Sequence, residues 1–187
     1  MAPIAVILLA AIFRLLPHAA NFAPITAMAL FGGVYLNKRW AIIAPLLAMF
    51  ISNYLLLYVN PFGTPYFNFT HLYSPLGIFN VSLIAVYISF VISGFVGIWL
   101  KNHKNAPTIL GSALFCSVQF FLITNASVWI EGMYSRSIIG LWQSYVAGIP
   151  FFRGTFLGDI VYTTAFFGSF ELIQLFANKK AEVKVSS

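Results

Sequence analysis

Charged residues are scarce in this sequence, and their scarcity excludes a soluble protein. They make up 7% of the 187 residues, against about 25% in a soluble domain, while 60% of the residues are hydrophobic. With a mean hydropathy of +0.90, the chain has too few polar residues to cover a folded protein in water. We therefore expect an all-α integral membrane protein that forms a single domain.

Cysteine and the common catalytic motifs are also nearly absent. A single cysteine, Cys116, excludes an internal disulfide and a cysteine-based metal cluster, and we expect it to be a small buried residue. The three histidines His18, His71 and His103 have no shared helical spacing, and no nucleotide-binding motif occurs. The sequence predicts no enzyme, no cofactor and no metal site. A haem or metal site at His18 and His71, or a small intramembrane enzyme, is the alternative.

Long apolar runs are what the sequence has in abundance. A helix needs about 20 apolar residues to cross about 30 Å of hydrocarbon, and strand-like alternation is absent. The first run lacks the preceding basic residues of a signal peptide, so we expect it to be a membrane helix. Residues 1–178 are expected to form one six-helix domain, followed by a polar cytoplasmic tail at 179–187. The six expected spans are 2–17, 23–36, 40–58, 76–100, 107–130 and 149–176.

The basic residues predict the orientation in the bilayer. Cytoplasmic turns carry an excess of Lys and Arg, so the side with most of the ten basic residues is expected to be cytoplasmic. Both termini then lie inside, and the net charge of +6 reflects topology and not nucleic-acid binding. The seven residues on that side are Lys38, Arg39, Lys101, Lys104, Lys179, Lys180 and Lys184.

The connection between the first two runs, residues 17–24, is expected on the outer side. Pro17 and Pro24 bracket it and disfavour helix, so its backbone is predicted to be non-helical. Because the first two runs are short for full spans, the connection is expected to dip below the outer surface. Irregular backbone at that depth requires protein or a water-filled cavity around it. The alternative is a thin, tilted hairpin with a proline-capped turn.

Two further segments are expected at the outer face. Residues 59–75 are aromatic and carry no formal charge apart from a protonated His71, which is typical of a lid over an apolar surface. Residues 132–148 are predicted to form a short amphipathic helix at the interface.

Polar residues inside apolar runs are costly, so each one is a candidate binding residue. Asp159 needs a partner, and we expect Arg14, Arg153, or Asn125 with a buried water. Glu171 is expected nearer the cytoplasm, paired with Lys179 or Lys180. Ion pairs that only fasten helices together are the alternative. The expected ligand-binding residues are Arg14, His18, Asn21, Asn53, Asn125, Trp129, Glu131, Arg153 and Asp159.

Small residues at four-residue spacing allow helix backbones to approach closely. Packing within the chain is the simpler interpretation, and docking of a partner is the alternative. The sets are Ala44 and Ala48; Ser89, Ser93 and Gly97; and Gly154 and Gly158.

Four stretches carry a family resemblance: "RLLPHAANFAPITAMALFGGVYL", "WAIIAPLLAMFISN", "FFLITNASVWIEGMY" and "YVAGIPFFRGTFLGDIVY". Together they resemble an uncharacterised bacterial six-helix membrane family labelled as transport proteins. That family is distantly similar to the substrate-binding S components of energy-coupling-factor (ECF) vitamin transporters. Where the family carries an Asp after Ile-Ser, this chain has Asn53.

The resemblance implies a bundle with an outward-facing cavity, in a multi-pass protein of the bacterial inner membrane. It implies a substrate-binding and transport subunit for a small nutrient, vitamin-like or metal-related. A transmembrane coupling subunit with ATPases would energise it, docking on a face that includes Ala5, Ala10 and Ala11. The rival hypothesis is a structural or accessory subunit of a larger membrane complex.

Overall fold

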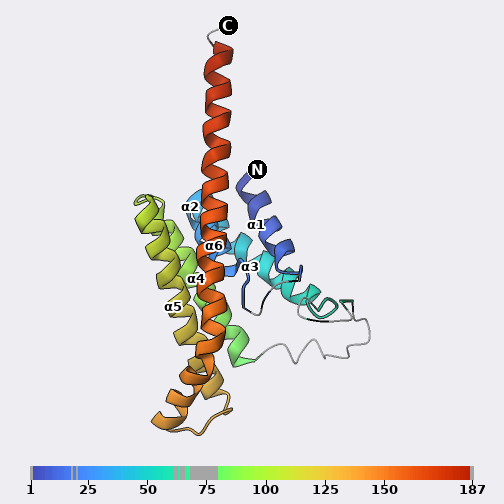
Figure 1. Ribbon diagram of the computed structural model, residues 1–187, viewed down its shortest axis with the longest axis vertical. Helices are drawn as coiled ribbons and strands as arrows, with labels where there is room; N and C mark the ends of the chain where they lie inside the picture. The colour runs from blue at the N-terminus through green and yellow to red at the C-terminus, as the bar shows by residue number, and fades with distance from the viewer. Residues whose placement is uncertain are drawn as a thin grey trace.

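The computed structural model describes residues 2–17, 19, 21–60, 63, 66–67 and 80–185, and its regular elements in those ranges are all α-helices (Figure 1). An isolated β-bridge joins Val59 and Phe67. The predicted all-α class is confirmed for this part of the chain. The six helices are α1 (Ala2–Phe13), α2 (Ile25–Tyr35), α3 (Lys38–Leu55), α4 (Val81–Leu100), α5 (Ala106–Ile130) and α6 (Ile138–Val185).

Three of the described helices, α4, α5 and α6, are long and apolar enough to cross a membrane. At 1.5 Å per residue, the 48 residues of α6 extend about 72 Å, so it continues well beyond a bilayer core of about 30 Å. Its last turns run into the expected tail at 179–187. The predicted separate helix at 132–148 was wrong, because α6 already begins at Ile138. Pro150 lies inside α6, and its first segment is inclined to the rest (Figure 1).

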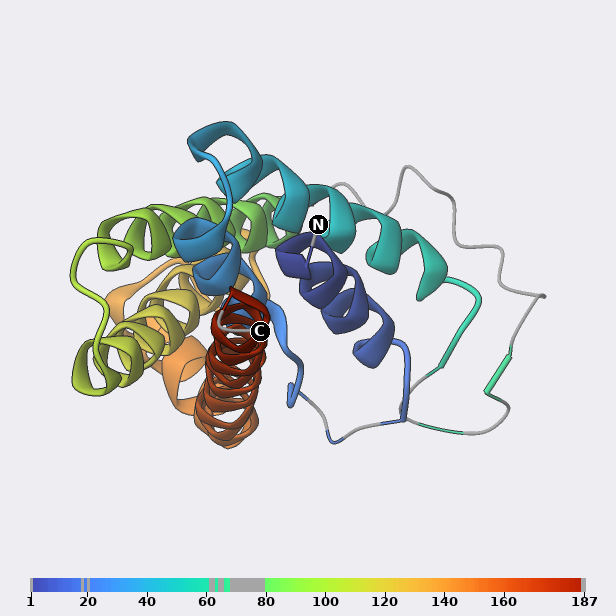
Figure 2. The ribbon, with the colours of Figure 1, turned by 90° about the horizontal axis from the view of Figure 1, so that it is seen from above.

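The two short apolar helices, α1 and α2, are even shorter than predicted, at 12 and 11 residues. Every residue of α2 from Thr26 to Val34 is buried. The reason is its position, because α1, α3, α4, α5 and α6 all contact it (Figure 2). A helix that is apolar on all sides suits such a central place. Six full membrane spans therefore do not follow from helix length alone.

A close crossing of α2 and α4 fixes the centre of the bundle. A Cβ on Gly97 would lie 2.5 Å from the Leu30 carbonyl oxygen, and one on Gly33 would lie 2.6 Å from Gly97 Cα. Ser93 and Ser89, one and two turns before Gly97, donate to carbonyls of their own helix at 2.9 Å. The predicted small-residue set on α4 therefore packs inside the chain.

The two ends of the bundle differ. The α4–α5 turn lies toward the end from which the last turns of α6 extend, and the α5–α6 turn lies at the opposite end (Figure 1). The start of α4 lies toward the same end as the α5–α6 turn. The α5–α6 turn and the start of α4 therefore share the end of the bundle opposite to the α4–α5 turn (Figure 1).

Candidate functional site

The connection between α1 and α2 is irregular, as predicted, at each of its described residues. His18 and residue 20 lie outside the described residues. A turn forms where the Phe22 amide donates to the Ala19 carbonyl at 3.0 Å. Asn21 has a positive φ angle of 59°, a conformation that asparagine adopts more readily than other residues with a Cβ atom. Asn21 therefore has a backbone role in shaping this turn.

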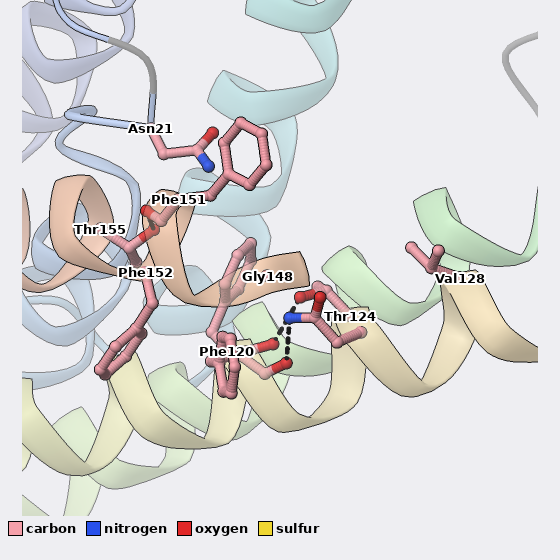
Figure 3. Close-up of a pocket in the computed structure, with 10 residues that line it drawn as sticks. Asn21, Phe120, Thr124, Val128, Gly148, Phe151, Phe152 and Thr155 are labelled. Carbon is pink, nitrogen blue, oxygen red and sulfur yellow. Dashed lines mark hydrogen bonds between the residues drawn. The ribbon is translucent and has the colours of Figure 1, made fainter. Parts of the chain in front are cut away.

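A hollow of about 180 Å³, which we name the Asn21 hollow, lies between this connection and helices α5 and α6. Asn21 projects toward Phe151 from one side, and Thr124 of α5 lies across from it (Figure 3). The aromatic walls are themselves packed, with the Phe121 and Phe152 ring centroids 4.9 Å apart. The lining residues are Asn21, Phe120, Phe121, Thr124, Asn125, Val128, Gly148, Phe151, Phe152 and Thr155.

Asn125 is held firmly at the floor of the Asn21 hollow. Its side-chain Nδ2 donates to the Phe121 backbone carbonyl at 2.8 Å, and its backbone carbonyl accepts from Ser144 Oγ at 2.6 Å. Gly148 makes this approach feasible, since a Cβ there would lie 2.2 Å from Asn125 Oδ1. The sequence analysis missed Gly148, although a glycine facing a polar residue of a neighbouring helix is a signal of close approach.

A second hollow, of about 330 Å³, surrounds Arg14, and we name it the Arg14 hollow. The guanidinium Nη1 donates to Ser52 Oγ of α3 at 2.8 Å, while Asn53 lines the cavity beside it. The start of α4 closes the other side. The lining residues are Arg14, Met49, Asn53, Leu57, Asn80, Ser82, Leu83 and Val86.

The chain's place among known proteins rests on one match. A family model described as a family of unknown function (DUF6580) matches residues 1–182. The chain belongs to the DUF6580 family. Neither a curated protein nor a solved structure matches it.

Asp159 of the DUF6580 chain does not pair with an arginine as expected. It is 1% exposed, and its Oδ2 accepts a hydrogen bond from Ser117 Oγ at 2.6 Å. Thr26 of α2 supplies a second hydroxyl bond. The prediction was wrong because hydroxyl groups of α2 and α5 supply the hydrogen bonds that the buried carboxyl group needs. Asp159 lines neither of the two hollows.

Three other predicted residues are not among those that line the two hollows. Glu131 accepts from the Ser82 amide at 2.7 Å and from Ser82 Oγ at 2.8 Å, so it anchors the start of α4. Trp129 donates from Nε1 to the Ser135 carbonyl at 2.9 Å in the α5–α6 turn. Arg153 is exposed on α6. Each of these positions serves packing or the surface, and none lines either hollow.

The expected partner of Glu171 was also wrong. Glu171 forms an ion pair with Lys104, next to the α4–α5 turn, and accepts from Tyr35 Oη at 2.5 Å. Lys104 precedes α5, whose N-terminus packs beside this part of α6. The prediction chose a lysine close in sequence, because Lys179 lies two turns away from Glu171 on the same helix.

The proposed lid at 59–75 lies largely outside the described residues. One described residue ties it to the site, because Tyr66 Oη donates to the Leu15 carbonyl at 2.7 Å, next to Arg14. Among the described residues, no group of three His, Cys, Asp or Glu side chains could hold a metal ion. The residues that line the two hollows offer hydrogen bonds, apolar contacts and, at Arg14, a positive charge.

Proposed function

We propose that this DUF6580 chain is a membrane subunit that binds a small nutrient and takes part in its transport. One observation carries the proposal: Asn21, in the irregular connection between α1 and α2, lines a hollow together with Asn125 and aromatic rings. Ligand sites are typically concave, mostly apolar and supplied with a few fixed polar groups. With about 180 Å³, the Asn21 hollow suits a compact ligand or one part of a larger one.

The proposal includes a topology of six passes with both termini cytoplasmic, in the bacterial inner membrane. The seven basic residues at the expected inner side support it. The short helix α2 is compatible with six passes because it is enclosed by protein, which shields it from lipid. In this topology, both hollows belong to the outer half and the Lys104–Glu171 pair to the inner half.

We also propose that a partner subunit supplies the energy for transport, as the distant similarity of the family to S components implies. The expected docking face at Ala5, Ala10 and Ala11 needs revision, since Ala10 is 1% exposed and packs inside the bundle. Ala5 is exposed, as are Leu8 and Leu9 at 53% and 52%, so any coupling subunit would meet this side of α1.

Mass spectrometry of small molecules released from the purified protein tests the proposal. Thr155→Phe places a ring in the Asn21 hollow, whereas Leu157→Phe, at a 55% exposed position on the same helix, is the matched control. We expect a compound that is released by the wild type and the control and is depleted at least about tenfold in the filled variant, which corresponds to about 1.4 kcal/mol. Equal release from all three folded proteins would favour the structural-subunit hypothesis.

A further inference from the structure

We propose that the Arg14 hollow is a separate binding site for the anionic group, a carboxylate or a phosphate, of a small amphipathic molecule. The proposal goes beyond the function above, because it assigns a second hollow and the chemical class of what it binds. It rests on the charge of Arg14, on the hydrogen-bond donors around it and on the apolar walls.

Arg14 carries a charge for which no carboxylate of the described residues forms an ion pair. The salt bridge found in those ranges joins Lys104 and Glu171 toward the other end of the bundle. Ser52 accepts one hydrogen bond, yet a guanidinium has five N–H donors. An arginine at a helix end in a membrane commonly extends toward water. This one instead reaches across to α3, so its charge is directed at the hollow.

Two carboxamides, those of Asn80 and Asn53, add hydrogen-bond donors to the lining of the Arg14 hollow. Asn80 Oδ1 accepts from the Leu83 amide at 2.7 Å, which leaves the Asn80 amide hydrogens to donate elsewhere. Asn53 adds a second carboxamide to the lining. Glu131 is the nearby acidic group, and it is held by the Ser82 amide and hydroxyl. A cationic fork beside carboxamide donors is suited to an anionic oxygen pair.

The remaining lining defines the rest of the ligand. Met49, Leu57, Leu83 and Val86 are apolar, and the cavity of about 330 Å³ is at the lower end of the usual range for ligand pockets, about 300–1,000 Å³. The occupant therefore has a short apolar body attached to its anionic group. A carboxylated small molecule and the phosphate of an anionic lipid share this chemistry.

Thermal unfolding in phosphatidylcholine nanodiscs tests the site, with hexanoate as the probe and hexanamide as its uncharged counterpart. We expect saturating hexanoate, at constant ionic strength, to raise the unfolding midpoint by about 3 °C, and hexanamide to have no effect. Arg14→Gln should abolish the shift. Arg153→Gln removes an exposed arginine and should retain it.

Asn80→Asp keeps the test valid if Arg14→Gln does not fold. Aspartate caps a helix as well as asparagine does, so α4 is retained while a negative charge enters the hollow. This variant should also lose the hexanoate shift. Thr155→Phe in the other hollow should leave the shift unchanged, so failure of this site and failure of the proposed function are distinguishable.

Nanodiscs containing phosphatidylglycerol distinguish the two sources of the anion. If the natural occupant is lipid, these discs stabilise the wild type but not Arg14→Gln, and hexanoate adds nothing further. If it is a small molecule, hexanoate acts equally in both lipids. The proposal is overturned if hexanoate gives no shift, if hexanamide gives an equal one, or if folded Arg14→Gln and Asn80→Asp keep it.

Discussion

At the scale of single residues, Asn21 combines a backbone role with a place in the hollow. Its positive φ angle explains why an asparagine is favourable in this turn, independently of any ligand. Its side chain nevertheless lines the hollow opposite Thr124 (Figure 3). The two roles can be separated experimentally, because glycine keeps the conformation and removes the amide.

Asn21→Gly should fold normally and lose ligand binding. Asn21→Ala should in addition lose about 1 kcal/mol of stability, because alanine is strained at positive φ. The unfolding midpoint and the amount of co-purified ligand give the two readouts. If Asn21→Gly retained the full amount of ligand, Asn21 would be a turn residue only.

Asp159, in contrast to Asn21, contacts buried side chains inside the bundle and lines neither hollow, so we expect its role to be structural. Ser117→Ala should destabilise the protein by about 1–3 kcal/mol, because the buried carboxyl group loses a donor. Asp159→Asn should cost less, since the carboxamide oxygen still accepts from Ser117. Detergent-based thermal melts of both variants, beside Arg153→Gln as a surface control, measure the difference. A larger loss for Asp159→Asn would contradict the structural role.

At the scale of helices, the α2–α4 crossing is the contact that is least able to accept a larger side chain. Gly97→Ala should cost about 1–3 kcal/mol, because its Cβ would overlap the Leu30 carbonyl of α2. Gly111→Ala on α5 is the control, as nothing lies within 4 Å of a Cβ there, and it should be neutral or stabilising. Equal unfolding midpoints for the two variants would show that α2 and α4 do not pack this closely.

The long helices were predictable from the sequence and the site contacts were not. Apolar runs gave the limits of α5 within one residue, 107–130 against Ala106–Ile130. The start of α6 was placed 11 residues late, because the polar residues of 138–148 resemble a separate surface helix. Partner choice failed for Asp159, since serine and threonine hydroxyls within apolar runs give no sequence signal of which neighbour they will bond. The binding residues expected around one cavity are divided in the structure: Asn21 and Asn125 line one hollow, Arg14 lines another, and Asp159 lines neither.

At the scale of the whole molecule, the account depends on a binding hollow that opens to the outer face of the membrane. Both the proposed function and the proposed topology require that arrangement. A cysteine at Thr124, which lines the Asn21 hollow, reports on it when the native Cys116 is replaced by alanine. Met133→Cys in the α5–α6 turn and Asn102→Cys in the α4–α5 turn report on the two faces.

The most direct measurement is labelling of these cysteines in intact cells with a membrane-impermeant thiol reagent. We expect Met133→Cys and Thr124→Cys to react from outside, and Asn102→Cys to react only after the membrane is permeabilised. Leu157→Cys, at a 55% exposed position of α6 that the proposed topology places against lipid, should stay unlabelled. Labelling of Thr124→Cys no faster than that of Leu157→Cys, or only from the inside, would contradict an outward-facing binding site.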